Sequence, residues 1–177
     1  MPEKPDKTSH FSAYLGNLGG EKFMIRVLFV CHGNICRSTM SQSIMAYQVS
    51  QKKMDSLFEI ESAATSREEI GNTPHYGTVG KLRQVGIPLV PHRAVQMTPA
   101  DYDYYDFLIG MDDWNIRNMT RIAGGDPDGK IFKLLQFADS SRDIADPWYT
   151  GNFDETYDDI LEGLEGFWRY LKDQNYI

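Results

Sequence analysis

The sequence of 177 residues contains little cysteine, a minority of positive charges and no long apolar run, and each shortage excludes a class of protein. Two cysteines are too few for a small secreted fold held by disulfides, so we expect a reducing compartment, the cytoplasm. Lys and Arg number 18 against 25 Asp and Glu, and the net charge of -7 argues against binding to nucleic acid or to anionic membranes. No segment approaches the ~18 apolar residues of a membrane-spanning helix.

The composition is otherwise that of an ordinary globular domain, with 41% hydrophobic and 24% charged residues. The length suits one domain with a sizeable core. Residues 1–23 are polar, contain Pro2, Pro5 and Gly19-Gly20, and lack the apolar core of a signal peptide. We therefore predict an N-terminal extension, flexible in character, over 1–23 and a folded domain over 24–177.

Short apolar runs alternate with helical patterns along the folded part. The runs show no period of two, which is typical of strands buried on both faces. The alternation predicts an α/β fold, an open doubly wound four-stranded parallel sheet with helices on both faces. The predicted strands are Ile25–Cys31, Leu57–Ser62, Phe107–Met111 and Lys130–Leu135, and the predicted helices are Thr39–Lys53, Tyr76–Val85, Asp112–Ile122 and Asp154–Leu171.

The segment 27–38 is the most informative, because an apolar strand runs directly into Cys31, with Arg37 six positions later and Ser38 opening a helix. Ligands of such folds bind at the carboxyl ends of strands. Successive backbone N–H groups and the helix N-terminus would stabilise a thiolate and then phosphoryl oxygens, and an arginine binds two such oxygens at once. The pattern predicts an oxyanion cradle with a nucleophilic thiol at its base. The alternative is a structural cysteine and an arginine on a solvated helix.

Asp146-Pro147 is the best candidate for an acid that protonates a leaving group. It lies in the loop between the fourth predicted strand and the last predicted helix. The proline favours an extended Asp146, which would aim its carboxyl group. We expect the following Trp148 and Tyr149 to line the same pocket. Asp-Pro is also a common turn dipeptide, and that interpretation stays open.

With these motifs in place, the chain resembles the low-molecular-weight protein tyrosine phosphatases over about residues 24–173. The matching motifs stand in the order and spacing of that family. They are Cys31-His32-Gly33-Asn34-Ile35-Cys36-Arg37-Ser38, Glu61-Ser62-Ala63-Ala64-Thr65, His92-Arg93-Ala94, Met111-Asp112-Asp113-Trp114-Asn115 and Asp146-Pro147-Trp148-Tyr149.

The resemblance implies a phosphoric monoester hydrolase that acts on phosphotyrosine proteins without a metal or cofactor. Cys31 would become a phosphocysteine, Arg37 would bind the phosphate and the transition state, and Asp146 would serve as general acid and then as general base. The implied phosphate-binding residues are His32, Gly33, Asn34, Ile35, Cys36, Arg37 and Ser38.

Further roles follow from the same resemblance. Ser38 would hydrogen-bond the thiolate, Asn34 would hold a left-handed turn, and His92 would bind Asn34 from behind. A core or surface histidine with satisfied hydrogen bonds explains His92 equally well. Cys36 would form a reversible disulfide with Cys31 under peroxide, or it is simply a small buried residue.

The sequence departs from the family pattern at the edge of the predicted pocket. Thr39 stands at a usual proline, Ala64 at a frequent glycine, and Glu68 where many members have an aromatic residue against the substrate ring. We expect Glu68 to form a pocket wall with Trp148 and Tyr149. An acidic wall would disfavour acidic peptides.

Four other functions remain as alternatives. An arsenate reductase needs additional cysteines to relay a disulfide, and this sequence has no third cysteine, so an outside thiol would have to serve. A protein-arginine phosphatase would carry a small hydroxyl residue at Ile35. A zinc module would have only Cys31, His32 and Cys36 as ligands, too few for a closed site. A phosphopeptide-binding module without catalysis has no support, because all the catalytic residue types are present.

Overall fold

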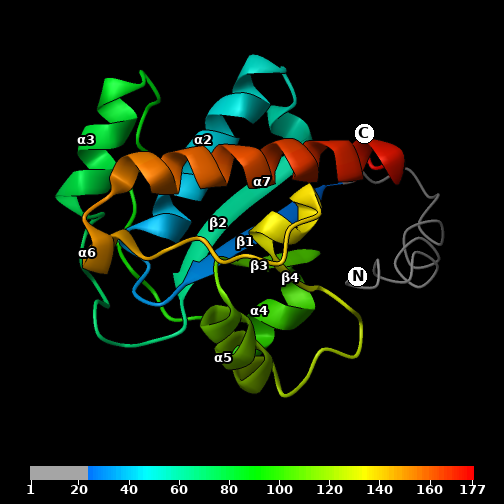
Figure 1. Cartoon of the computed structure of the whole chain (residues 1–177). Helices are drawn as coiled ribbons and strands as arrows, with labels where there is room; N and C mark the ends of the chain where they lie inside the picture. The colour runs from blue at the N-terminus through cyan, green and yellow to red at the C-terminus, as the bar shows by residue number, and fades with distance from the viewer. Residues whose placement is uncertain (1–23) are drawn as a thin grey trace.

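A four-stranded parallel sheet forms the centre of the computed structural model, which describes residues 24–177 (Figure 1). The predicted extension 1–23 lies outside the described residues. The strand order is β2-β1-β3-β4, which confirms the predicted sheet. The strands are β1 (Ile25–Cys31), β2 (Phe58–Ala64), β3 (Phe107–Gly110) and β4 (Ile131–Lys133).

Helices cover both faces of the sheet, as predicted. Side chains of β1 alternate between the faces, since successive residues of a strand point in opposite directions. Val27 and Phe29 belong to the larger core under α2 and α7, whereas Leu28 and Val30 belong to the smaller core under α4 and α5. The helices are α2 (Arg37–Gln51), α3 (Tyr76–Gln84), α4 (Pro99–Tyr104), α5 (Asp113–Ala123), α6 (Pro147–Thr150) and α7 (Phe153–Asp173), with short 3-10 helices η1 (Asp55–Leu57) and η2 (Leu134–Ala138).

The long helix α7 crosses one face of the sheet and closes the larger core (Figure 1). Its inward side chains are fully buried: Ile160, Leu164, Phe167 and Leu171. The helix lies close to η2 because it has Gly163 and Gly166 there. A Cβ at Gly166 would collide with the backbone carbonyl of Phe137. This contact therefore depends on glycine.

Several predicted boundaries were wrong. The run Lys130–Leu135 was predicted as one strand, but β4 ends at Lys133, and Leu134 and Leu135 continue in η2. Both leucines are fully buried beneath α7. An apolar run shows burial but does not distinguish a strand from a buried turn.

The remaining differences are small. The second strand begins at Phe58 and extends to Ala64, the third ends at Gly110, and the first helix begins at Arg37 rather than at Ser38 or Thr39. Helix α2 ends at Gln51, since Lys53 has a φ of 56°, outside the right-handed helical region. Helices α4 and α6, of 6 and 4 residues, were not predicted because they are too short for a periodic pattern.

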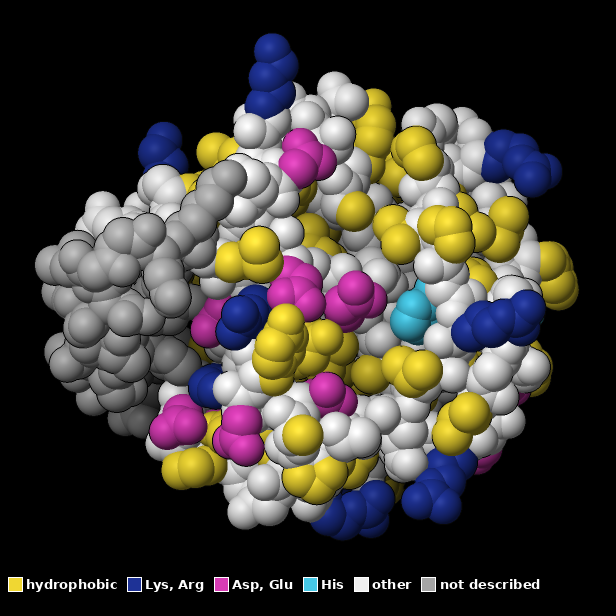
Figure 2. Space-filling model, turned by 180° about the vertical axis from the view of Figure 1, so that it is seen from behind, with side chains coloured by type: hydrophobic (Ala, Val, Ile, Leu, Met, Phe, Trp, Pro, Cys, Tyr) yellow, Lys and Arg dark blue, Asp and Glu magenta, His cyan; other side chains and the backbone are white. Residues whose placement is uncertain are grey.

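Charged side chains are interspersed on the face opposite the view of Figure 1. Figure 2 shows Lys and Arg scattered around this face, with acidic and hydrophobic groups nearer its centre. One pair of opposite charges on the described surface is Glu59 and Arg26, 3.6 Å apart, and the Glu59 carboxylate also accepts a hydrogen bond from Tyr104. The face in Figure 2 therefore offers no continuous basic stripe of the kind that follows a nucleic-acid backbone.

Candidate active site

The loop from Cys31 to Arg37 joins the carboxyl end of β1 to the N-terminus of α2, in the middle of the sheet. Cys31 is buried, and its Sγ lies 3.1 Å from Ser38 Oγ. Ser38 Oγ accepts a hydrogen bond from Asn34 Nδ2 at 2.8 Å. The Ser38 hydroxyl proton is therefore available to Cys31, and Ser38 donates to this sulfur when it is a thiolate.

Asn34 organises the interior of the loop. It is fully buried and has a φ of 59°, the left-handed turn that the resemblance implied. Its Nδ2 also donates to Ser62 Oγ at 2.9 Å, and its Oδ1 lies 2.6 Å from His92 Nε2. Because this oxygen only accepts, His92 carries a proton on Nε2. Burial lowers the pKa of His92 below its ordinary value, which favours the neutral ring.

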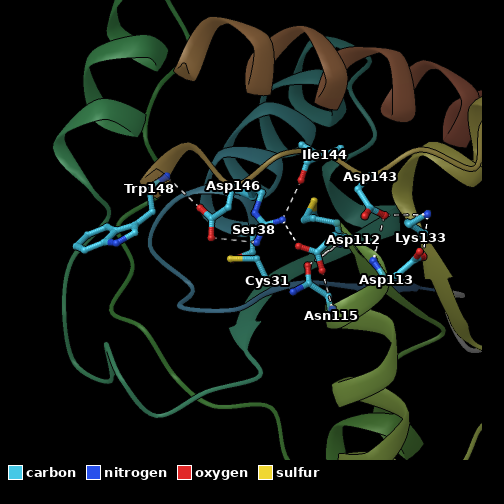
Figure 3. A network of polar contacts seen from close by, with 12 residues as sticks. Cys31, Ser38, Asp112, Asp113, Asn115, Lys133, Asp143, Ile144, Asp146 and Trp148 are labelled. Carbon is cyan, nitrogen blue, oxygen red and sulfur yellow. Dashed lines mark hydrogen bonds and ion pairs between the residues drawn. The ribbon is translucent and has the colours of Figure 1, made fainter. Parts of the chain in front are cut away.

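The guanidinium of Arg37 is buried, with 2% of its side chain exposed. Nη1 donates to Asp112 Oδ2 at 2.6 Å and to the Ile144 carbonyl at 2.9 Å, and Nη2 donates to Asp146 Oδ2 at 3.3 Å. Figure 3 labels these three partners, Asp112, Ile144 and Asp146. Burial acts to lower the pKa of Arg37, but the negative charges of Cys31, Asp112 and Asp146 outweigh it and raise the pKa. Arg37 is therefore a permanent cation fixed beside Cys31.

Asp146 has the extended backbone expected before proline, with φ -77° and ψ 113°. Its Oδ1 accepts a hydrogen bond from Trp148 N at 3.0 Å and caps α6, while its Oδ2 faces Arg37. Figure 3 shows Asp146 and Cys31 on neighbouring segments of the site. The predicted acid and the predicted nucleophile thus belong to one site, although they are more than a hundred residues apart in the sequence.

One pocket unites these groups. Its lining residues come from the Cys31 loop, from the segment after β2 and from the start of α6. They are Cys31, His32, Gly33, Ile35, Cys36, Glu68, Glu69, Asp146, Trp148 and Tyr149. A thiol at the base, an arginine behind it and a carboxyl group at the side form the arrangement that phosphoryl transfer through cysteine needs.

Comparison with known proteins agrees with this geometry. The family model described as low molecular weight phosphotyrosine protein phosphatase matches residues 26–176. The chain belongs to the low molecular weight phosphotyrosine protein phosphatase family.

Individual relatives cover nearly the whole described chain. The low molecular weight protein-tyrosine-phosphatase YfkJ of Bacillus subtilis is 40% identical over 144 residues, which cover 80% of this chain and 92% of YfkJ. The crystal structure of YfkJ superposes with a TM-score of 0.83 at 38% identity, covering 88% of this chain and 99% of that one. The phosphatase SP-PTP of Streptococcus pyogenes gives a TM-score of 0.73 at 35% identity, with 85% and 93% covered.

A structure named for another phosphorylated amino acid is also similar. The Drosophila arginine phosphatase DARP gives a TM-score of 0.77 at 26% identity, covering 84% of this chain and 98% of DARP. The family scaffold therefore includes proteins named for two phosphorylated amino acids.

Two residues of this family member were missed by the sequence analysis. Asp112, quoted only as part of a motif, holds Arg37 through Oδ2 and caps α5 by accepting from Asn115 N through Oδ1 at 2.7 Å. The sequence could have indicated this residue, because Asp112 directly follows a predicted strand that lies beside the Cys31 strand, and ligands bind at the carboxyl ends of such strands. Glu69, next to Glu68 in the pocket lining, had no separate signal.

The other predicted residues lie at the pocket or next to it. Glu68 Oε2 is 3.0 Å from His32 Nε2, and both side chains are partly exposed. Trp148 and Tyr149 are exposed by 56% and 82% at the pocket edge. Thr39, at the usual proline, donates its hydroxyl to the Cys36 carbonyl at 3.1 Å, and no side chain caps the N-terminus of α2.

Both cysteines are free thiols in the described structure. Burial, with the nearby Cys31 and Asp146, raises the pKa of Cys36 to about 12. Cys36 is therefore a protonated thiol at neutral pH.

Residues 24–177 contain neither a membrane-spanning helix nor a metal-binding cluster of side chains. None of their helices has the length and apolar character needed to cross a membrane. No group of three or more His, Cys, Asp or Glu side chains in this range could hold a metal ion.

Proposed function

We propose that this protein hydrolyses phosphotyrosine in proteins, and aryl phosphates, through a phosphocysteine on Cys31. The observation that carries the proposal is that Cys31 and Asp146 line one pocket while Arg37 is bonded to Asp146 at its side. The family membership supports the same reaction.

In the first step the Cys31 thiolate attacks phosphorus, the S–P bond forms and the P–O bond to the phenol breaks. Asp146 gives its proton to the departing phenolate oxygen. The contacts of Arg37 with Asp112, Ile144 and Asp146 use three of its five N–H groups. The two others, on Nε and Nη2, bind the equatorial oxygens of the phosphoryl group.

In the second step Asp146, now a carboxylate, takes a proton from water as the water oxygen attacks phosphorus. The S–P bond breaks and inorganic phosphate leaves. Ser38 stabilises the departing thiolate, because its hydroxyl lies 3.1 Å from Cys31 Sγ. Asn34 and His92 keep Ser38 and the loop in place through the hydrogen bonds described above.

Two variants test the chemistry. Cys31→Ser abolishes hydrolysis of p-nitrophenyl phosphate, and Asp146→Asn lowers kcat/KM by about 10²–10⁴-fold, least for acidic phenols that leave without a proton. Circular dichroism confirms that both variants are folded. Wild-type activity in Cys31→Ser would disprove the mechanism.

Phosphoarginine is the second candidate substrate, supported by the likeness to the Drosophila arginine phosphatase. Ile35 is buried at the pocket and occupies the position where we expect a small hydroxyl residue in that branch. Its bulk favours a flat aromatic ester. The deciding experiment compares phosphotyrosine, phosphoserine and phosphoarginine substrates for the wild type and Ile35→Thr, with Cys31→Ser as the blank.

We further propose that Glu68, Trp148 and Tyr149 contact the substrate around the phosphotyrosine. Glu68 brings negative charge to the pocket edge and Glu69 adds to it. Acidic flanking residues of a peptide are therefore disfavoured relative to basic ones. Glu68→Gln and Glu68→Trp, assayed with matched acidic and basic phosphopeptides, reduce this preference; an unchanged ratio contradicts it.

Cys36 is proposed as a redox partner. Peroxide oxidises Cys31 to a sulfenic acid, the Cys36 sulfur attacks the Cys31 sulfur, the S–O bond breaks, and the Cys36 proton leaves with the hydroxide as water. After peroxide, dithiothreitol restores wild-type activity but not that of Cys36→Ser. Equal recovery of both would contradict this role.

The remaining assignments are proposals of the same kind. A catalytic thiol must stay reduced, which suits the cytoplasm. Residues 24–177 form the catalytic domain. Nucleic acid and membranes are not expected as partners, because the net charge is -7.

A further inference from the structure

Lys133, the last residue of β4, is a buried cation outside the pocket lining. Only 10% of its side chain is exposed. Its Nζ lies 2.9 Å from Asp113 Oδ1, 3.0 Å from Asp143 Oδ1 and 2.5 Å from the Ser141 carbonyl oxygen. An ammonium group has three donors, and three acceptors are present. The lysine thereby joins the sheet to the start of α5 and to the segment 141–146.

Two carboxylates share the lysine at this point. Asp143 Oδ1 also accepts from the backbone N of Asp113 at 3.1 Å, so the two aspartates are close together. Burial acts to lower the pKa of Lys133, but its hydrogen bonds and charge interactions with Asp113 and Asp143 outweigh it and raise the pKa. Without the cation, the segment 141–146 loses two of its bonds, those of Lys133 Nζ to Ser141 and Asp143. The repulsion between Asp113 and Asp143 adds little, because these side chains are 77% and 48% exposed.

The same segment leads directly to the acid. Ile144, next to Asp143, donates its N–H to the Met111 carbonyl at 2.9 Å and accepts from Arg37 Nη1 at 2.9 Å. Asp146 follows two residues later and faces Arg37 Nη2. Figure 3 shows Lys133 in contact with Asp143, and Asp143, Ile144 and Asp146 in succession along the segment that leads to Cys31.

We propose that Lys133 is a positioning residue that holds the segment 141–146, and with it the Asp146 carboxyl group, at the correct distance from the phosphoryl oxygen. The inference rests on the proposed function, because it needs Asp146 as the general acid. Arg37 is also held by Asp112 at 2.6 Å, outside the segment 141–146. Loss of Lys133 therefore affects proton transfer by Asp146 more than phosphate binding by Arg37.

The dependence of the hydrolysis rate on the leaving group distinguishes a role in positioning Asp146 from a role in stability alone. Phenyl phosphate releases a basic phenolate that needs the proton, whereas p-nitrophenyl phosphate releases an acidic phenol that needs it little. Displacement of Asp146 by about 1 Å therefore slows the first substrate more than the second. A general loss of folded protein slows both equally.

The experiment compares kcat/KM of wild type and Lys133→Met for both substrates. We expect a loss of about 10–100-fold for phenyl phosphate and less than about threefold for p-nitrophenyl phosphate. The inhibition constant of inorganic phosphate changes by less than about threefold, since Cys31 is retained and Arg37 keeps its bond to Asp112. Lys130→Met is the matched control, because Lys130 directly precedes β4 and donates to the Tyr102 carbonyl; its substrate ratio stays that of wild type.

A second variant makes the test independent of the folding of Lys133→Met. Asp143→Asn keeps an acceptor for Asp113 N but removes the ion pair, and we expect the same direction of change in the substrate ratio. An unchanged ratio in the folded variants would overturn the role of Lys133. Absence of aryl phosphatase activity in the wild type would instead overturn the proposed function.

Discussion

The side chain of Asn34 makes four hydrogen bonds although its backbone has a φ of 59°. Asparagine tolerates this region better than other residues that have a Cβ, and its amide then serves the loop from the inside. Position 34 thus requires both a residue that tolerates a positive φ and an amide side chain. Substitutions can separate these two requirements.

Replacing Asn34 by Ala or by Gly removes the same amide. Alanine in addition resists the positive φ, so we expect Asn34→Ala to unfold at a free energy about 1 kcal/mol lower than Asn34→Gly. Urea denaturation of both variants measures the difference. Equal stabilities would contradict the strain that we assign to this position.

A second prediction concerns Cys36. With its pKa raised to about 12, only about one molecule in 10⁴ carries a Cys36 thiolate at pH 8. We expect iodoacetamide to modify one thiol per chain, on Cys31, and inorganic phosphate to slow that reaction. Peptide mass spectrometry identifies the labelled residue, and labelling in urea modifies both. Rapid labelling of Cys36 in the native protein would contradict the raised pKa.

Among the elements, the contact between α7 and η2 is sensitive to a single methyl group. Gly166→Ala improves helix propensity but places a Cβ against the Phe137 backbone, so we expect a loss of about 1–3 kcal/mol. Gly80→Ala in α3 is the matched control, because a Cβ at Gly80 meets nothing within 4 Å. It stabilises by up to about 1 kcal/mol. Thermal and urea unfolding of the pair decide the prediction; a gain at both positions would contradict it.

The elements also show what the sequence could predict. The strand, loop and helix around Cys31 are contiguous, so their pattern was visible, and the alternation of strands and helices predicted the sheet. Leu134 and Leu135 were assigned to a strand because burial beneath α7 leaves the same apolar pattern as burial in a sheet. Only the tertiary structure distinguishes them.

The candidate site likewise contains residues that the sequence predicted and residues that it did not. The pattern around Cys31 and Arg37 predicted a phosphate cradle, and the Asp-Pro dipeptide predicted an acid. Asp112 and Lys133 were missed, since a charged residue next to a helix or strand end usually points to solvent. These two side chains instead bind partners that are distant in the sequence. Asp112 binds Arg37, 75 residues away, and Lys133 binds Asp113, 20 residues away.

For the whole molecule, His92 links stability to pH. Burial lowers its pKa below the ordinary value of 6.5, so between these two pKa values the unfolded chain binds more protons than the folded one. The free energy of unfolding therefore decreases as the pH falls below 6.5. Urea denaturation at pH 7.5 and 5.5 measures this loss, and we expect a smaller loss for His92→Gln, which has no titrating ring. An equal loss in both proteins would assign the dependence to other groups.

The central position of β1 also determines when an active molecule can exist during synthesis. This strand and its thiol leave the ribosome early, but the core above them is completed by α7, and Arg37 binds a carboxylate 109 residues further along the chain. Parallel pairing of β1 with β3 likewise waits for distant residues. A nascent chain therefore carries Cys31 before Asp146 and the closed core are in place, and the proposed site is complete only when α7 has packed onto the sheet.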